Sequence, residues 1–318
     1  MRILIYGFGR MGLTHFTILN SINENLKFTI IEPNRFLLSI LNKNFPNVNF
    51  LKDDSSLKEP YDISLITAPP FAHLKLLKKC LKRGDKKVFI EKPFGGYTNI
   101  YDDYLNQTKN LYVGYVLRFN PCIQWIKNKI SKKNIFSVKG QFLSSTLNKR
   151  PVGWRNGPFS GVLNEVGSHV IDLIQYITEC KSMEVNHCKI QSVISDVDDI
   201  LDAELISNDG VNISLHFNWV KKNIRKPVFK LEIVMKDGLK YLIDQQEIVI
   251  RNNKEEKSDK ISVTDIAETV PFYLRGIDFS KQMEDLLNDC STIASVEDGL
   301  QVNKVINKIM LHEGNFRR

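Results

Sequence analysis

The first 120 residues alternate short apolar runs with segments of helical periodicity, and this alternation constrains the fold more than any other feature. The runs are apolar throughout, which is typical of parallel strands covered on both faces. Between them lie segments such as Ala72–Leu81, where leucines recur at three- and four-residue steps. The repeated order of strand and helix predicts a doubly wound α/β sheet over residues 1–120. We expect its strands at Ile3–Tyr6, Phe28–Ile31, Val48–Leu51, Ile63–Thr67, Val88–Ile90 and Leu111–Val116.

After residue 120 the pattern changes to helices that flank a long series of consecutive strands. This order predicts an α+β domain over residues 121–318 with a large, mostly antiparallel open sheet. The prediction allows the last helices of this domain to pack against the first domain. Asp209-Gly210 and Asp237-Gly238 are dipeptides typical of hairpins, and the polar segment Arg251–Lys260 predicts an exposed loop. Helices are expected near Pro121–Ile130, Val162–Thr178, Phe279–Asn288 and Leu300–Leu311, and strands near Phe136–Leu143, Glu184–Ile194, Asp202–Ile206, Val211–Phe217, Phe229–Met235, Tyr241–Ile243 and Ile248–Ile250.

The composition is that of an ordinary globular protein, with 42% hydrophobic and 25% charged residues. No window approaches the roughly 18 uninterrupted apolar residues of a membrane helix. The opening run Ile3–Tyr6 leads straight into glycines with no signal-peptide pattern, so we expect a cytoplasmic protein. Five scattered cysteines indicate reduced thiols, and the six histidines form no zinc motif, so no metal is expected.

The net charge of +8 is unevenly distributed along the chain. Residues 1–122 hold 17 Lys and Arg against 10 Asp and Glu, whereas residues 123–318 hold 27 against 26. The basic residues form no stripe with interleaved aromatic residues, so we expect no nucleic-acid partner. A basic first half suits an anionic small ligand without identifying one.

The most specific motif is Gly7-Phe8-Gly9-Arg10-Met11-Gly12, which follows the first expected strand and opens a helix. In this context the glycines permit a tight turn and a close approach of a pyrophosphate to the helix N-terminus. Glu32 ends the second strand, 20 residues after Gly12, where an acid accepts hydrogen bonds from a ribose. The alternative is a glycine-rich turn of another α/β protein, such as a methyltransferase. Glu32 favours NAD(H), although Arg10 and Arg35 keep NADP(H) open.

Two further segments carry residue types suited to acid–base chemistry. Glu91-Lys92-Pro93 follows the fifth expected strand, at the ligand-binding edge of such sheets, and Pro93 favours an extended Lys92. In the helix near Val162–Thr178, helical spacing places Glu165, His169 and Asp172 on one stripe. A carboxylate one turn from an imidazole suits a general acid–base pair. Taken alone, the first segment is more typical of a surface turn, and the second of a helix with one satisfied histidine.

Together, these motifs resemble those of the Gfo/Idh/MocA oxidoreductase family. The resemblance covers nearly the whole chain. The motifs that carry it are the G-x-G-x-x-G start, Ile66–His73, Glu91-Lys92-Pro93 and Gly161–Asp172, with further landmarks at Gly114–Tyr115, Arg118–Pro121, Trp154–Arg155 and Ser295–Leu300.

The resemblance implies a Rossmann domain and an open-sheet domain with the active site between them. It implies NAD(P)-dependent hydride transfer between nicotinamide and a secondary alcohol or ketone of a sugar, cyclitol or nucleotide-linked sugar. Lys92 falls on the family's active-site lysine and His169 on its catalytic histidine. Glu165 stands where the family usually has aspartate, so its carboxylate reaches one methylene further.

From these motifs we expect His169 to remove the hydroxyl proton and Lys92 to stabilise the developing negative charge, with Glu165 as the third catalytic residue. The expected cofactor-binding residues are Gly7, Phe8, Gly9, Arg10, Met11, Gly12, Glu32, Thr67, Pro69, His73, Glu91 and Lys92. The expected substrate-binding residues are Lys92, Arg118, Asn120, Trp154, Arg155, Glu165, His169 and Asp172.

The second domain also predicts a partner. Val211, Ile213, Leu215 and Phe217 alternate along one strand and leave the sheet with two usable faces. An uncovered face of this kind usually pairs with another subunit, so we expect a homodimer or homotetramer. The alternative to an enzyme is a non-catalytic NAD(P)-binding regulator of the same fold, but a regulator has no need for both Lys92 and His169.

Overall fold

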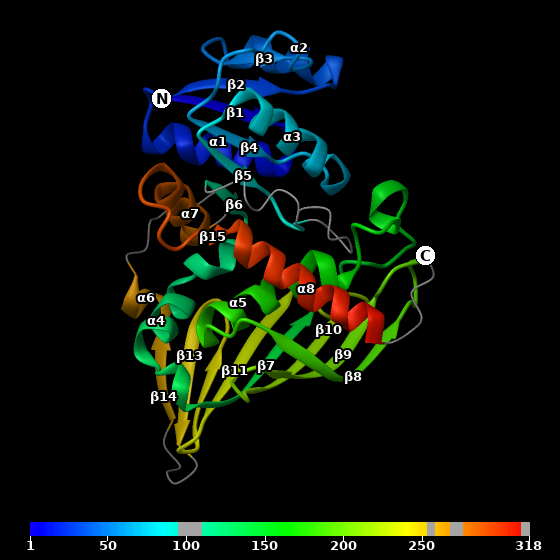
Figure 1. Ribbon diagram of the computed structural model, residues 1–318, viewed down its shortest axis with the longest axis vertical. Helices are drawn as coiled ribbons and strands as arrows, with labels where there is room; N and C mark the ends of the chain where they lie inside the picture. Colours follow the sequence, from blue (N-terminus) through cyan, green and yellow to red (C-terminus); the bar gives the residue numbers. More distant parts are fainter. Residues whose placement is uncertain (95–109, 253–257, 268–275, 313–318) are drawn as a thin grey trace. The chain divides into compact units, whose positions relative to one another are not determined.

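A computed structural model describes residues 1–94, 110–252, 258–267 and 276–312 of the chain (Figure 1). These residues divide into two compact units. Unit 1 contains residues 1–94, 110–116 and 276–300, and unit 2 contains residues 117–252, 258–267 and 301–312. The segment 276–300, which the sequence analysis grouped with residues 121–318, therefore lies in the first unit.

Within the described residues, unit 1 is built on a seven-stranded sheet of order β15-β6-β5-β4-β1-β2-β3. All its neighbouring strands are parallel except β15, which pairs antiparallel with β6. The six strands predicted from apolar runs are present, and β1, β2, β4 and β5 are buried on both faces, which explains why their runs do not alternate. The edge strand β15 was not predicted. The strands are β1 Arg2–Tyr6, β2 Lys27–Ile31, β3 Asn49–Leu51, β4 Ile63–Ile66, β5 Lys87–Ile90, β6 Leu111–Val113 and β15 Ala294–Ser295.

The helices of unit 1 connect these strands and cover the sheet (Figure 1). Helix α1 packs against α7, which comes from a distant part of the chain. Helix α2 begins at a side-chain cap, because Asn34 accepts hydrogen bonds from the N–H groups of Phe36 and Leu37. These helices are α1 Arg10–Ile22, α2 Arg35–Asn44, α3 His73–Arg83 and α7 Ile277–Leu287, with a 3₁₀ turn η1 at Pro70–Ala72.

Unit 2 contains an eight-stranded sheet, counted over the described residues, of order β14-β13-β12-β11-β7-β10-β9-β8. Its pairs are antiparallel except β7 with β10, which confirms a mostly antiparallel sheet. Gly210 and Gly238 have φ of 79° and 90° in the two predicted hairpins, β9–β10 and β11–β12. The strands are β7 Ile135–Leu143, β8 Met183–Gln191, β9 Ile200–Ser207, β10 Asn212–Asn218, β11 Val228–Met235, β12 Leu239–Ile243, β13 Glu247–Asn252 and β14 Ser258–Ser262.

The predicted loop Arg251–Lys260 is partly wrong. Its first two residues end β13, and Ser258–Lys260 begin β14, which pairs antiparallel with β13. The middle of the segment, residues 253–257, lies outside the described residues. Polar composition hid an edge strand here, because an edge strand needs no apolar run to form its ladder.

One face of the unit 2 sheet is covered by helices (Figure 1). Helix α5 packs on β7, and the amine of Lys308 on α8 binds the carbonyl of Met183 on β8. The helices described in this part of the chain are α4 Pro121–Lys129, α5 Ser168–Thr178, α6 Val263–Ile266 and α8 Val296–His312, with the short elements η3 Val116–Phe119, η4 Lys132–Asn134, η5 Gly153–Asn156 and η6 Leu163–Gly167. The boundary between the units falls inside α8, after Leu300.

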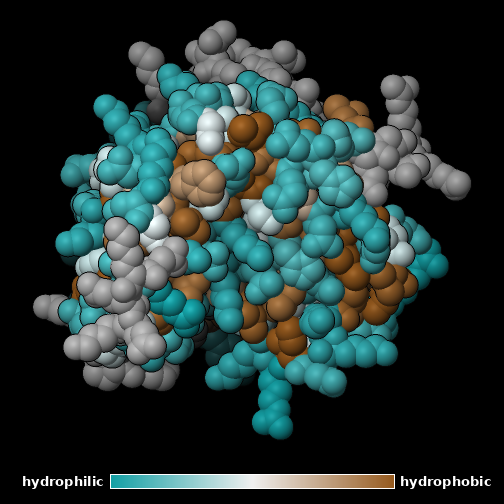
Figure 2. Space-filling model, turned by 90° about the horizontal axis from the view of Figure 1, so that it is seen from below, coloured by the Kyte–Doolittle hydropathy of each residue, from teal (hydrophilic) through white to brown (hydrophobic). Residues whose placement is uncertain are grey.

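Apolar side chains of the sheet point to this covered face. Ile213, Leu215 and Phe217 of β10 are buried, and the residues between them are only partly buried or exposed. Lys139, Glu204 and His216 lie together on the opposite face, as the strand register shows. Seen from below, the surface is mostly hydrophilic with scattered apolar groups (Figure 2). The apolar residues of β10 all lie on the covered face. The second face therefore combines polar residues with a few apolar side chains from other strands, such as Leu242 and Val249. No helix in the described part of the chain has the length and apolarity to cross a membrane.

Candidate functional site

The glycine motif forms the turn between β1 and α1. Gly7 has φ of 90°, and a Cβ there would lie 3.0 Å from the Ala68 Cα. A Cβ on Gly12 would overlap the Gly7 carbonyl oxygen, so helix and strand approach too closely for a side chain. A Cβ on Gly9 would meet nothing within 4 Å. Gly9 thus borders open space, as a loop that receives a ligand must.

Helix α1 begins at this open space, and the first N–H groups of a helix have no acceptor within the helix itself. Gly9 precedes its first turn and provides no side-chain cap, so the N–H groups there can bind an anion. Arg10 is exposed and Met11 partly exposed at the same turn. The Phe8 side chain is instead buried, with its ring 5.6 Å from Phe16 and 5.5 Å from Phe50. These features fit a dinucleotide whose pyrophosphate lies on the helix N-terminus.

Two predicted residues brace the loop from neighbouring strands. Glu32 at the end of β2 accepts hydrogen bonds from the N–H groups of Phe8 and Asn34, each at 3.0 Å. Thr67 after β4 donates its hydroxyl to the Gly7 carbonyl at 2.7 Å. The carboxylate of Glu32 is therefore fixed beside the glycine loop, where a ribose would bind.

His73 is a structural group in the turn that follows β4. Pro69 precedes η1, and His73 begins α3 with its Nε2 2.8 Å from the Ala68 carbonyl oxygen. Burial lowers the pKa of His73 to about 4, outweighing the hydrogen bond to Ala68 and the charge of Glu91, which raise it. The imidazole is neutral at pH 7 and donates to the carbonyl.

The Glu-Lys-Pro segment follows β5, at the same carboxyl edge of the sheet. Glu91 is buried, and its Oε1 lies 2.7 Å from Nε2 of His15 on α1. Its Oε2 accepts the backbone N–H of Lys92 at 3.2 Å. The Lys92–Pro93 bond is cis, and Lys92 is partly exposed. Lys92 is thus partly exposed, while its backbone N–H is bound to the buried carboxylate of Glu91.

In unit 2, Glu165 and His169 lie on a helical segment that combines two geometries. Glu165 belongs to the π-helical turn η6, and His169 to the first turn of α5, which continues from it. Both are partly exposed, whereas Gly167 and Ser168 between them are buried. Glu165 Oε1 accepts a hydrogen bond from Ser160 Oγ at 2.7 Å. The predicted helix at Val162–Thr178 exists, but it starts with a π turn, a feature frequent at functional sites.

The start of this segment is fixed by Asp198, which the sequence analysis missed. Asp198 is fully buried and accepts the Leu163 N–H at 2.6 Å, and its carbonyl accepts the Val162 N–H at 2.8 Å. Gly161 has φ of 107°, and a Cβ there would overlap the Asp198 carboxylate. The only signal in the sequence was the acidic pair Asp198-Asp199 in a polar segment.

Three predicted substrate residues bind other parts of unit 2. Arg118 and Asp172 form a buried bidentate ion pair, with Arg118 Nε 2.9 Å from Asp172 Oδ2 and Nη2 2.6 Å from Oδ1. The Arg118 guanidinium also stacks on Tyr176. Asn120 caps α4 by accepting the Cys122 N–H and donates to the Gln245 carbonyl, each at 3.0 Å. Their charges and amide groups hold η3 and α4 in place within the unit.

Trp154 and Arg155 lie together on η5. The Arg155 guanidinium carbon is 5.0 Å from the centre of the Trp154 ring, so the two side chains stack. Arg155 is exposed and Trp154 partly exposed. This pair offers a planar apolar surface beside a positive charge.

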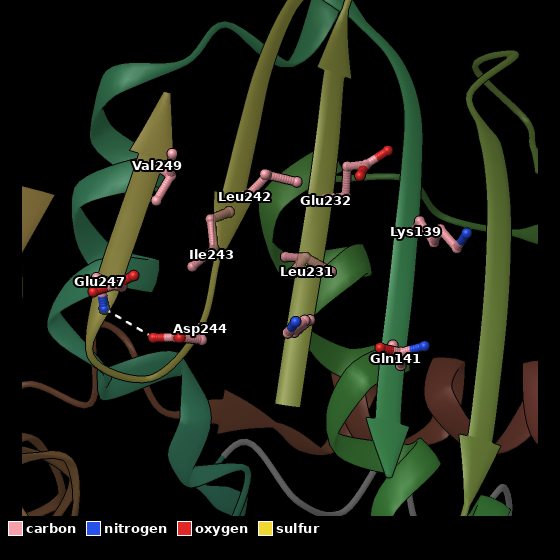
Figure 3. A pocket seen from close by; sticks show the side chains of 10 residues that line it. Lys139, Gln141, Leu231, Glu232, Leu242, Ile243, Asp244, Glu247 and Val249 are labelled. Atoms are coloured by element: carbon pink, nitrogen blue, oxygen red, sulfur yellow. Dashed lines mark hydrogen bonds between the residues drawn. The ribbon is translucent and has the colours of Figure 1, made fainter. Parts of the chain in front are cut away.

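A hollow of about 360 Å³ lies elsewhere, on strands β7, β11, β12 and β13 (Figure 3). Lys139, Gln141 and Glu232 extend along it from neighbouring strands, with Leu242 and Val249 on its apolar side. None of the predicted site residues lines it. Among the described residues, no group of three His, Cys, Asp or Glu side chains is arranged to hold a metal ion.

Comparison with known proteins extends these observations. Residues 1–102 match the family GFO_IDH_MocA, described as an oxidoreductase family with an NAD-binding Rossmann fold. The match confirms the family resemblance over these residues and NAD as the cofactor type of this domain. No curated protein matches the sequence.

Solved structures share the fold over nearly the whole chain. Levoglucosan dehydrogenase in complex with NADH and levoglucosan is 18% identical with a TM-score of 0.81, covering 99% of this chain and 97% of its own. An oxidoreductase domain protein from Kribbella flavida is 18% identical with a TM-score of 0.82, covering 98% and 96%. UDP-N-acetylglucosamine 3-dehydrogenase GnnA from Acidithiobacillus ferrooxidans is 17% identical with a TM-score of 0.78, covering 98% and 97%. At these identities the likeness establishes the fold.

Proposed function

We propose that this chain, whose first 102 residues match an NAD-binding oxidoreductase domain, interconverts a secondary alcohol and a ketone on a sugar, cyclitol or nucleotide-linked sugar. The observation that carries the proposal is the exposure of Glu165 and His169. Within residues 161–170 only these two and Val166 are partly exposed, and the rest are buried. Two proteins of the same fold are named as dehydrogenases of a sugar and of a nucleotide-linked sugar, which supports this substrate class.

Each residue has a distinct task in the proposed reaction. A bound nicotinamide supplies the hydride acceptor or donor. His169 takes the hydroxyl proton during oxidation and returns it during reduction. Lys92 donates a hydrogen bond to the same oxygen and stabilises its negative charge. Glu165, held by Ser160, orients His169 or binds a neighbouring hydroxyl.

Glu32 supports NAD(H) as the preferred form of the cofactor. Its carboxylate is fixed by two backbone N–H groups beside the glycine loop, so it cannot easily turn away from a 2′-phosphate. Repulsion would therefore disfavour NADP(H). Arg10, in the glycine motif, and Arg35, three residues after Glu32, are both exposed. They are the residues that could pair with a 2′-phosphate and so counter this preference.

Trp154 and Arg155 are the strongest candidates for the substrate wall. A stacked aromatic ring and guanidinium suit a sugar face and an anionic group, respectively. We assign Arg118, Asn120 and Asp172 a supporting role within unit 2 rather than direct contact with substrate, because their polar atoms are already bound to other groups of that unit. The charge of Arg155 would favour a nucleotide-linked substrate over a neutral sugar.

We further propose that the chain is a cytoplasmic homodimer or homotetramer. All five cysteines are free thiols, which supports a reducing compartment. The helix-free face of the unit 2 sheet carries both signs of charge and apolar groups, and the hollow in Figure 3 lies on it. Such a mixed surface suits a self-complementary contact between two copies.

The first test is the change in absorbance at 340 nm with each cofactor in both redox states. The substrate panel pairs free sugars and inositols with UDP- and dTDP-linked sugars and their keto forms. We expect turnover with one substrate class and NAD(H). His169→Asn and Lys92→Met should each lower kcat by about 100-fold, and the double variant should lose less than the product of both, because both residues act on one oxygen.

Matched substitutions at exposed positions provide the controls. His312→Asn at the end of α8 and Lys75→Met on α3 should keep full turnover. If His169→Asn keeps most of the wild-type turnover, His169 is not the base. Tight NADH binding without turnover across the panel would favour a cofactor-binding regulator instead.

A further inference from the structure

His15 is a fully buried histidine that the proposed reaction does not use. It lies on α1, three residues after the last glycine of the nucleotide loop, and none of its side chain is exposed. Its Nε2 is 2.7 Å from Oε1 of Glu91, although 76 residues separate the two in the chain. The contact connects the helix that starts at the nucleotide loop with the segment that carries Lys92.

The carboxylate of Glu91 is buried among close neighbours. The ring of His15 meets Phe89 edge-on at 5.2 Å and lies 6.3 Å from Phe279. On the other side of the carboxylate, a Cβ on Gly114 would lie 3.0 Å from Glu91 Oε2 and 3.0 Å from Phe89 Cζ. Glycine at position 114 and imidazole at position 15 therefore enclose the carboxylate from two sides.

The fixed carboxylate also holds the main chain of the lysine. Glu91 Oε1 is bound by His15, and Oε2 accepts the N–H of Lys92 at 3.2 Å. A buried carboxylate that loses a hydrogen-bond donor must turn, take up a proton or admit water. Each response would disturb the acceptor of the Lys92 N–H.

We propose that His15 is a positioning residue that sets the Lys92 backbone through Glu91. The effect on catalysis rests on the proposed function, since it requires Lys92 to act on substrate. The effect on the backbone does not, and it can be measured in the absence of any substrate.

The test is residue-resolved hydrogen exchange of the Lys92 amide in the full-length protein. His15→Leu removes the donor and Gly114→Ala pushes on the carboxylate from its other side, so both should speed this exchange about fivefold or more. His15→Gln retains an N–H donor and should restore the rate to within about twofold of wild type. The Phe89 and Ile90 amides in the β5 ladder should not change. His216→Leu breaks a solvent-exposed histidine–carboxylate pair on unit 2, 2.6 Å long, and should leave Lys92 unaffected.

Kinetics with whichever substrate the panel identifies supply the second measurement. His15→Leu should lower kcat about tenfold, with the Kd of NADH changed by less than about twofold, and His15→Gln should recover most of the rate. Unchanged Lys92 exchange in both His15→Leu and Gly114→Ala overturns the proposal. Faster exchange with unchanged kcat overturns the catalytic part. Faster exchange in a protein without dehydrogenase activity would leave the backbone role intact and reject the proposed function. If His15→Leu does not fold, Gly114→Ala carries the same test.

Discussion

Gly7, Gly9 and Gly12 belong to one motif, but at the scale of single residues they meet different surroundings. Gly7 has a positive φ, and a side chain on Gly12 would overlap the Gly7 carbonyl oxygen. The turn itself therefore requires glycine at both positions. Gly9 has φ of −71° and open space where a Cβ would stand. The absence of a side chain at Gly9 therefore leaves room for a ligand and is not required by the fold. Gly7 and Gly12, in contrast, are required by the fold.

The two roles can be separated by substitution. Gly9→Ala should change the free energy of unfolding by no more than about 0.5 kcal/mol, and yet weaken NADH binding about tenfold or more. Gly12→Ala should destabilise unit 1 by about 2 kcal/mol, because the new Cβ meets backbone. Urea unfolding and NADH fluorescence titration measure the two quantities. Equal NADH affinity in Gly9→Ala and wild type would place the pyrophosphate elsewhere.

At the scale of elements, the sheet of unit 2 separates its two faces by strand alternation. Buried apolar residues of β10 face the helices, and Asn212, Ser214 and His216 point the other way. Lys139 and Glu232 on neighbouring strands place opposite charges side by side on this outer face (Figure 3). A face of this kind can either remain exposed to solvent or bind a second copy of the chain. The apolar groups between the charges determine whether the second copy binds.

We expect light scattering at micromolar concentration to give at least twice the 36.7 kDa of one chain. Leu242→Glu and Val249→Glu place charges on the apolar side of the hollow and should shift the mass towards a single chain. Leu311→Glu, at a position that is 79% exposed at the end of α8, should not. A monomeric wild type would contradict the proposed assembly.

At the scale of the whole molecule, stability should depend on pH through a buried neutral histidine. Burial lowers the pKa of His73 to about 4 in the folded protein, against an ordinary value of 6.5. The unfolded chain therefore binds a proton between these values that the folded chain does not. The His73 contribution is fully present above pH 6.5 and is lost as the pH falls towards 4.

The loss should reach at most about 3 kcal/mol of unfolding free energy over that window. Urea unfolding at a fixed protein concentration, at pH 7, 6 and 5, would reveal the slope. His73→Gln keeps a donor for the Ala68 carbonyl and should be less sensitive to pH across the same range. An identical slope in wild type and His73→Gln would show that His73 is not the group responsible.

The sequence by itself determined the local elements. Six strands of unit 1, both Asp-Gly hairpins and the helix that carries His169 follow from spacing over a few residues, because periodic burial repeats along a strand or helix. The nucleotide loop follows for the same reason, since the roles of Gly7, Gly9 and Gly12 depend on one turn. The edge strands β14 and β15 were missed, because edge pairing leaves little apolar signal in a short segment.

Only the tertiary structure decided which polar groups meet. Arg118 binds Asp172 across 54 residues, Glu91 binds His15 across 76, and Asp198 binds the backbone of Leu163 across 35. Nothing in local spacing selects these partners, because each pair forms only after the chain has closed a long loop. The residue types of the candidate site can thus be read from the sequence. Whether an arginine faces a ligand or a buried aspartate is set by packing, where an unpaired charge is too costly to bury.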